Sequence, residues 1–389
     1  MMVCGLLFLM LTLAFPSGTR LLGDGELHVR ELIGGVWDSH PKMNRSPLLF
    51  WLLHQVRSWS FVSPDQIYPW VSRMAGIVFV LLSFTAGRCF APRPDDRGLL
   101  ILCLLSQGYV ALFFGYAENY PILFPLLLGY SILCLRAMEG EGPVYQPAVL
   151  LGLTVPLHFT AFAYAPALIW VVWRRQRANA ADRILSMLSL LAVPATTFLS
   201  LALIGISPFS LPQSALGSHL LPWGTPGPGL TPYAVLSAEH LIDTLNQYAL
   251  VVPVVVMGTP ILVLGSRRSD ATDVLLLAMA LPPVLFTVLF NPAIGAFRGW
   301  DVFALPSVPL VLLAGRSLLR VCQPVRLRRL AVLVISVCSV HPHSGLGRGQ
   351  CRCRIVRGAF RSYGRVGAAL DLCARLRGRN SCRTLPGQG

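Results

Sequence analysis

The residues most able to do chemistry in this chain are a few carboxylates, histidines and an arginine at the ends of apolar segments. The stretch GYAENYP places Glu118 and Asn119 between two apolar runs. An ionisable residue at the end of a membrane span is costly unless it meets water, a partner or a cation. Glu118 is therefore either a snorkelling or capping residue, or a carboxylate that faces a polar cavity as an acid, a base or an ion ligand.

A second acidic group, Asp24 and Glu26, follows the first apolar segment in the stretch LLGDGELHVREL. An ordinary polar turn explains an Asp-Gly pair equally well. The functional interpretation is a general base at the membrane surface, whose pKa rises near the low-dielectric boundary and which accepts a proton from an acceptor hydroxyl. If Glu118 faces the same cavity as Asp24, the two carboxylates could share a divalent cation or divide these roles.

A third group, Arg298 and Asp301, lies in the stretch GAFRGWDVFALP, where a loop re-enters the apolar region. The simpler interpretation is a local ion pair beside Trp300, which would anchor the loop at the interface. The functional interpretation gives the planar guanidinium of Arg298 to a phosphate, because it can bond to two oxygens at once. Asp301 would then orient Arg298.

Two histidines are weaker candidates. His158 lies inside a long apolar stretch, where a lone histidine is more often structural, although its ring could donate a hydrogen bond to a phosphate. His240 lies in the amphipathic stretch SAEHLIDTLNQ, whose polar face needs no special role.

The elements that position these residues are predicted to be transmembrane helices. The chain is 54% hydrophobic and 13% charged, whereas soluble domains average about 25% charged residues. Its net charge of +15 comes from arginine, with Lys42 as the only lysine; in a membrane protein such charge marks cytoplasmic loops rather than a nucleic-acid site. Several apolar stretches approach the roughly 20 residues that cross a bilayer. The candidate spans include Gly98–Phe114 and Leu330–Val340. We therefore predict an all-α, polytopic transmembrane bundle. The chain has no P-loop, GxSxG, HExxH or Rossmann motif.

Charge in the short linkers predicts the orientation of these spans. The positive-inside rule places arginine-bearing linkers such as RRQRANAADR in the cytoplasm. All of these linkers lie on that side only if Pro147–Trp173 crosses the membrane twice, with a turn near His158. This gives about eleven passes, with all the candidate residues on the extracytoplasmic side. The outer stretches SPLLFWLLHQVRSW and LSAEHLIDTLNQYALVVP are predicted to be interfacial helices.

The last residues differ from the rest. The segment 341–389 is rich in Arg, Gly and Cys, with Asp371 as its only acidic residue. It is either a basic cytoplasmic tail or the out-of-frame product of a GC-rich gene, and we favour a frameshift near Val340. The predicted organisation is a transmembrane domain over 1–340 and a frameshifted or disordered tail over 341–389.

The pattern resembles the GT-C glycosyltransferases, the class of the dolichyl-phosphate-mannose protein mannosyltransferases and the bacterial aminoarabinose transferases. In that class, an acidic residue follows the first transmembrane helix and amphipathic juxtamembrane helices come next. Asp24 takes the acidic position and SPLLFWLLHQV resembles the first juxtamembrane helix. The resemblance spans about Leu7 to Val340, mostly as architecture, and the usual adjacent acidic pair is replaced here by Asp24-Gly25-Glu26.

The resemblance implies an inverting transfer of a sugar from a polyprenyl-phosphate donor to an acceptor hydroxyl on a glycan, lipid or protein. The reaction would take place at the extracytoplasmic face of a bacterial inner membrane, with Asp24 as the base. The implied site comprises catalytic Asp24, Glu26 and Glu118, phosphate-binding Arg298 and His158, and supporting Asn119, Asp301 and His240. Two alternatives are a transporter or flippase of an anionic or lipid-linked substrate, which edge carboxylates would also suit, and a non-catalytic membrane scaffold.

Overall fold

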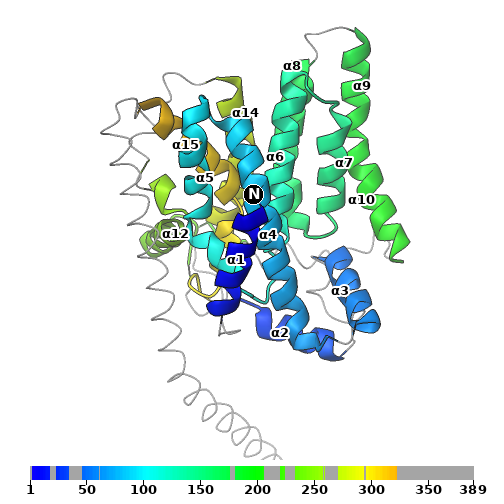
Figure 1. The fold of residues 1–389 in the computed structure, drawn as a ribbon, viewed down its shortest axis with the longest axis vertical. Helices are drawn as coiled ribbons and strands as arrows, with labels where there is room; N and C mark the ends of the chain where they lie inside the picture. Colours follow the sequence, from blue (N-terminus) through cyan, green and yellow to red (C-terminus); the bar gives the residue numbers. More distant parts are fainter. Residues whose placement is uncertain are drawn as a thin grey trace, which may run out of the picture. The chain divides into compact units, whose positions relative to one another are not determined.

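The chain forms a bundle of helices (Figure 1). The computed structural model describes residues 2–17, 23–34, 46–60, 62–175, 180–205, 220–223, 233–256, 258, 270–292 and 295–321. Within these ranges, every regular element is a helix, and the only β-type pairing is the isolated bridge between Leu220 and Phe290. The predicted all-α class is confirmed. The segment 341–389 and the predicted span Leu330–Val340 lie outside the described residues.

Three stretches of helix are long and apolar enough to cross a membrane. They are α4 (Pro64–Phe90), the stretch Ile184–Leu203 and α14 (Ala271–Leu289). The second stretch joins α9 (Ala180–Leu190) to α10 (Ala192–Leu203). At 1.5 Å per residue, the 27 residues of α4 span about 40 Å, more than the hydrocarbon core needs. The chain is therefore an integral membrane protein.

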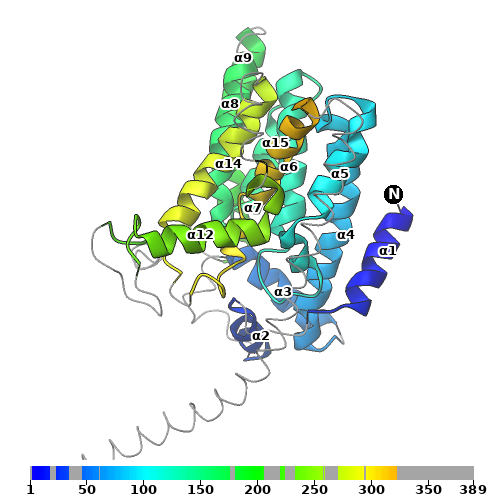
Figure 2. The same cartoon turned by 90° about the vertical axis from the view of Figure 1, so that its left-hand side faces the viewer.

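Shorter helices complete the bundle around α6 (Leu123–Glu139), which packs against α4, α7 and α8. The helix α1 (Met2–Ala14) lies along the outside of α4, and α10 lies along α7 (Figures 1 and 2). The remaining bundle helices are α5 (Arg97–Leu105), α7 (Tyr145–Thr154), α8 (Ala165–Arg175) and α15 (Ser307–Val321). Because several of these helices have fewer than 18 residues, the count of about eleven passes stays a prediction.

The predicted turn near His158 is present. The helix α7 ends at Thr154, a 3₁₀ helix covers Phe159–Tyr164, and α8 follows it. The ring Nδ1 of His158 accepts a hydrogen bond of 3.3 Å from the backbone N–H of Thr160, which caps the 3₁₀ helix. Both α7 and α8 pack against α6, so the long apolar stretch is divided where the sequence predicted it.

One predicted membrane span is not a single continuous helix in the structure. The sequence suggested a single helix from Gly98 to Phe114, but the structure divides it into α5 and a 3₁₀ helix over Gly108–Phe113. The backbone of Leu250 packs directly against Gly108 and leaves no room for a side chain there. The amide of Gln107 replaces the lost helical bonds, donating to Cys103 O at 2.8 Å and accepting from Val254 N at 3.3 Å.

The helices outside the bundle lie around the end at which α4 begins. They are α2 (Gly25–Gly34), α3 (Pro47–Trp59) and α12 (Ala238–Val251). Figure 2 shows α12 running across the long axis of α4, as predicted for an interfacial helix. Arg57 of α3 donates a hydrogen bond of 2.7 Å to the carbonyl of Leu32, near the C-terminus of α2. An apolar cluster joins α2, α3 and α4 to the residues around the 118 turn: Val29, Leu32, Leu49, Leu53, Ile67, Tyr68, Ala117 and Leu157.

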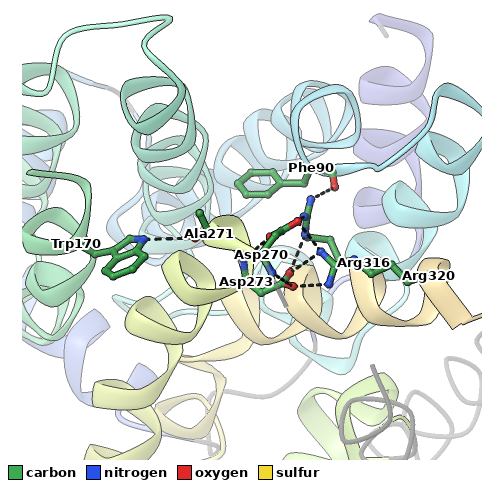
Figure 3. A network of polar contacts seen from close by, with 7 residues as sticks. All are labelled: Phe90, Trp170, Asp270, Ala271, Asp273, Arg316 and Arg320. Carbon is green, nitrogen blue, oxygen red and sulfur yellow. Dashed lines mark hydrogen bonds and ion pairs between the residues drawn. The ribbon is translucent and has the colours of Figure 1, made fainter. Parts of the chain in front are cut away.

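A network of ion pairs lies at the other end of α4, where α14 begins (Figure 3). Asp270 and Asp273 form a capping box, in which each side chain accepts from the backbone N–H of the other. Arg316 of α15 donates to Asp273 Oδ1 at 3.1 Å, to Asp270 Oδ2 at 2.7 Å and to the carbonyl of Phe90 at 2.6 Å. Arg320 bonds the same two carboxylates. The network ties together the ends of α4, α14 and α15.

Candidate functional site

Three segments far apart in the sequence meet at Gly23, between α1 and α2. Gly23 has φ +68°, a conformation that glycine adopts most easily, and its N–H donates to Arg298 O at 2.7 Å. A Cβ at this position would collide with Glu118 Oε1 and would lie 3.0 Å from the Tyr116 hydroxyl and 3.1 Å from Asp301 Oδ2. Two carboxylates and a phenol therefore converge where the chain enters α2.

Glu118 is buried among polar groups rather than extended towards the surface. Its side chain accepts a hydrogen bond through Oε1 from the backbone N–H of Asp24, and its Oε2 lies 3.4 Å from His28 Nε2. The turn that carries it is attached to α4, because Gly115 N donates to Ser72 Oγ at 3.1 Å and Ser72 donates to Leu112 O at 2.7 Å. The two carboxylate oxygens of Glu118 are thus fixed by Asp24 and His28, and the turn that carries Glu118 is fixed by α4.

Asp24 is half-buried at the first turn of α2, where its carbonyl accepts from the N–H of His28 at 3.0 Å. The next residue, Gly25, packs so closely on the carbonyl of Ala117 that a Cβ there would collide with it. This contact explains why glycine, rather than a second acid, follows Asp24. A second acidic side chain directly after Asp24 has no room beside the 118 turn.

Asp301 is fully enclosed, with 2% of its surface exposed. Its Oδ1 accepts from the N–H of Val302 at 3.0 Å at the start of a 3₁₀ helix (Val302–Ala304), and its Oδ2 points towards Gly23. Burial, and next the charge of Glu118, raise the pKa of Asp301 well above its usual range. Burial and the neighbouring carboxylates therefore favour the protonated form of Asp301, which can donate a hydrogen bond.

The environment of Tyr116 is similar. Its hydroxyl accepts from Trp300 Nε1 at 3.2 Å, and its ring lies against the indole. Burial raises the pKa of Tyr116 well above 10, and the neighbouring carboxylates Asp301 and Glu118 raise it further. The phenol therefore remains protonated and is a second neutral donor in the cluster.

His28 is a central residue that the sequence analysis did not identify. It is buried, its Nε2 lies near Glu118, and its Nδ1 lies 3.6 Å from Glu31 Oε2. Burial lowers the pKa of His28, but the carboxylates of Glu118 and Glu31 outweigh burial and raise it to about 9. His28 is therefore an imidazolium at neutral pH. Its signal in the sequence is helical spacing, since Asp24, His28 and Glu31 recur at i, i+4 and i+7 along one helix face.

Asn119 completes the cluster. Its Nδ2 lies 3.3 Å from His28 Nε2, and its Oδ1 accepts a hydrogen bond of 3.3 Å from the hydroxyl of Tyr68. Of the predicted site residues, the structure brings together Asp24, Glu118, Asn119 and Asp301.

The other predicted residues lie outside this cluster. Glu26 is exposed on α2 and forms an ion pair of 3.0 Å with Arg30. His240 donates a hydrogen bond of 2.7 Å from Nε2 to the carbonyl of Val288 and thereby joins α12 to α14. The ring of His158 packs 4.8 Å from that of Tyr120, which follows Asn119 directly.

Arg298 is close to the cluster through its backbone. Its carbonyl binds Gly23, its side chain is half-buried, and in the described residues its guanidinium makes no hydrogen bond or ion pair. The predicted orientation of Arg298 by Asp301 has no counterpart in these contacts, because the start of the 3₁₀ helix turns the Asp301 carboxylate back towards Val302 and Gly23.

Among the residues that the structure describes, the cluster contains more acidic than basic groups. Four carboxyl groups share it with one imidazolium: Asp24, Glu31, Glu118, Asp301 and His28. Among the residues that the structure describes, no group of three or more His, Cys, Asp or Glu side chains is arranged to hold a metal ion. The arrangement instead combines ionised carboxylates, which can accept a proton, with the neutral donors Asp301 and Tyr116.

Comparison with known proteins identifies the fold. No protein-family model and no curated protein matches the chain. The structure of ArnT from Cupriavidus metallidurans bound to undecaprenyl phosphate matches with a TM-score of 0.57 and 14% identity, over 86% of this chain and 62% of that one. The apo structure of the same protein matches with a TM-score of 0.55 and 14% identity, over 82% and 58%. The chain thus spans about three fifths of the length of these proteins, and at this identity the likeness concerns the fold.

Proposed function

The chain has the fold of the GT-C membrane glycosyltransferases, and we propose that it transfers a sugar from a polyprenyl-phosphate donor to an acceptor hydroxyl. The observation that carries this proposal is the meeting of Asp24, Glu118 and Asp301 around Gly23. The matched ArnT structure was determined with undecaprenyl phosphate bound, which supports a donor of the same lipid class. The acidic cluster supplies the base that such a transfer requires.

In the proposed reaction, Asp24 is the general base. Its carboxylate is only half-buried, so an acceptor can reach it, and Glu118 fixes its backbone N–H. Asp24 takes the proton of the acceptor hydroxyl as the oxygen forms a bond to the anomeric carbon. The bond from that carbon to the phosphate oxygen breaks on the opposite face, so that the configuration inverts and the polyprenyl phosphate leaves with the electron pair.

Arg298 is proposed to stabilise the leaving phosphate. The loop that carries it is bonded to Gly23, and its guanidinium is available for a bidentate contact. His158 would assist from the neighbouring turn, since its ring packs beside Tyr120. The protonated carboxyl of Asp301 and the phenol of Tyr116 would donate hydrogen bonds to sugar or acceptor oxygens.

The proposed location of this reaction is the extracytoplasmic face of a bacterial inner membrane. The arginine-bearing linkers at the opposite end of the bundle favour a cytoplasmic position for that end. The cluster at the start of α2 would then open to the outer side, where a lipid-linked donor can arrive within the bilayer.

The test uses purified full-length protein in lipid vesicles with a panel of radiolabelled polyprenyl-phosphate sugars. Wild-type protein is expected to consume at least one donor, and Asp24→Asn to lose about a thousandfold in rate, within the range for loss of a general base. Asp95→Asn, an exposed carboxylate in a short 3₁₀ helix (Pro94–Asp96), is the matched control. Equal rates for wild type and Asp24→Asn would contradict the proposal. Movement of a labelled lipid across the membrane without consumption would favour a flippase.

A further inference from the structure

The buried ring of His28 packs against two aromatic side chains. The phenol of Tyr68, from α4, stacks on it with centroids 6.0 Å apart, and Phe50, from α3, meets it edge-on at 5.6 Å. The two aromatic rings limit rotation of the imidazole. Its two nitrogens consequently remain directed at Glu118 on one side and Glu31 on the other.

These contacts form a chain of three side chains across the cluster. Glu31 Oε2 lies 3.6 Å from Nδ1, and Glu118 Oε2 lies 3.4 Å from Nε2. The other carboxylate oxygen of Glu118, Oε1, accepts a hydrogen bond from the backbone N–H of Asp24. All four groups are thus connected in the order Glu31, His28, Glu118 and Asp24.

We propose that His28 and Glu31 are positioning residues, which hold the Glu118 carboxylate in the orientation that fixes the first turn of α2 and, with it, the carboxylate of Asp24. The catalytic consequence rests on the proposed function, whereas the coupling of His28 to Glu118 does not. Neither His28 nor Glu31 needs to touch a substrate.

Charge explains why the cluster needs a cation at this place. Glu118 lies close to Asp301 and Asp24, and a buried carboxylate with acidic neighbours takes up a proton unless a cation compensates. The described groups facing His28 are Glu31 on its own helix, Tyr68, Phe50, and the 118 turn with Glu118 and Asn119. The arginine of α3, Arg57, donates to the backbone carbonyl of Leu32 near the end of α2. His28 is thus the cation that this part of α2 offers to Glu118.

The coupling can be measured without any donor. Full-length protein in detergent micelles, labelled with ¹³C at histidine Cε1, is titrated by NMR, and His28→Phe identifies the resonance. In wild type, His28 is expected to titrate near pH 9. In Glu118→Gln and in Glu31→Gln, the midpoint should move down towards the ordinary value of 6.5, whereas Glu239→Gln, an exposed acid on α12, should leave it unchanged. A wild-type midpoint near 6.5, or one that Glu118→Gln does not move, would overturn the proposal.

The positioning role is tested by turnover of a polyprenyl-phosphate sugar that the wild type consumes. His28→Phe keeps a ring between Tyr68 and Phe50 but loses the charge, and should lower kcat about a hundredfold, as expected for a displaced reacting group, with KM unchanged. His54→Phe, on α3, is the matched control. His28→Gln, which retains an N–H donor, should restore part of the rate.

A double-mutant comparison separates positioning from general damage. If His28 acts through Glu118, adding His28→Phe to Glu118→Gln should cost little beyond Glu118→Gln alone. A full further loss, equal to that in the wild-type background, would contradict the proposal and indicate a structural role. If no donor is consumed by the wild type while the NMR titration behaves as expected, the proposed function fails and the coupling of His28 to Glu118 stands.

Discussion

The two ends of α4 carry polar clusters of opposite design. Near Phe90, two aspartates face two arginines, and each of their ion pairs joins a donor to an acceptor. Near Tyr68, the residues that the structure describes place four carboxyl groups around one imidazolium. The 22 residues between Tyr68 and Phe90 correspond to about 33 Å of helix, so that the clusters are independent of each other.

The difference in charge balance indicates a difference in role. A buried ion-pair network with matched charges and good geometry joins helices, and removal of one partner is costly. The other cluster contains Asp301, a buried carboxyl group whose pKa is raised, and perturbed carboxyl groups of this kind are typical of functional sites. We therefore assign the Arg316 network to the stability of the bundle and the Glu118 cluster to its chemistry.

The largest expected effect is at the balanced end. Arg316→Met leaves the buried carbonyl of Phe90 without its side-chain donor and leaves Asp270 and Asp273 with Arg320 as their one remaining arginine partner, and it should destabilise the protein by about 3–5 kcal/mol. Thermal unfolding in detergent measures the change. Donor consumption per folded molecule should stay at the wild-type value, because the site lies at the other end of α4. A specific loss of turnover in folded protein would show that the two ends are coupled.

Gly23→Ala probes the tight junction of the acidic end. The new Cβ would collide with Glu118 and crowd Asp301, and the positive φ alone costs about 1–2 kcal/mol. The variant should unfold at a lower temperature and also lose turnover, because Asp24 follows directly. Gly205→Ala is the control, since it has φ +75° and open space around its Cβ position. Equal effects of the two substitutions would mean that the crowding at Gly23 is unimportant.

The two ends should also respond differently to pH. The folded-state pKa of His28 is raised from 6.5 to about 9, so the ion pairs of His28 stabilise the protein fully below pH 6.5 and are lost as pH rises through about 9. The melting temperature should therefore fall across this window, and His28→Phe should remove the part of the fall that comes from His28. An identical pH profile for His28→Phe would contradict the assignment of a charged His28.

The smallest expected effect is that of Asp301→Asn. The pKa of Asp301 is raised in the fold, so ionisation opposes folding as pH rises above the unfolded value of 3.8. An amide mimics the protonated carboxyl, and the stability at pH 7 should be unchanged or slightly higher. Turnover should be retained in part, because Asn still donates a hydrogen bond. A large loss of stability would indicate that Asp301 is ionised.

Much of this molecule was predictable from local patterns. The apolar runs and the arginine-bearing linkers predicted an all-α membrane bundle, and a lone His158 in an apolar stretch marked the turn between α7 and α8. Asp24 and Glu118 stood out because carboxylates are expensive beside apolar segments. In the structure, Glu118 accepts a hydrogen bond from the backbone N–H of Asp24.

The remainder depends on long-range contacts that no local pattern contains. Asp273 meets Arg316 across 43 residues, and Asp24 meets Glu118 across 94. Asp301 was expected to orient Arg298, but the local 3₁₀ turn directs it elsewhere. His28 was overlooked because the helical face shared by Asp24, His28 and Glu31 is visible only once α2 is recognised as a helix.

The most direct test of the central claim compares one carboxylate from each end of the bundle in the donor-consumption assay. Glu118→Gln and Glu139→Gln, the latter an exposed acid at the C-terminus of α6, are measured in vesicles with the same polyprenyl-phosphate sugars. Glu118→Gln is expected to remain folded and to consume donor about a hundredfold more slowly than wild type, as for a misplaced catalytic group. Glu139→Gln is expected to consume donor at the wild-type rate. Equal rates for Glu118→Gln and wild type would contradict the central claim.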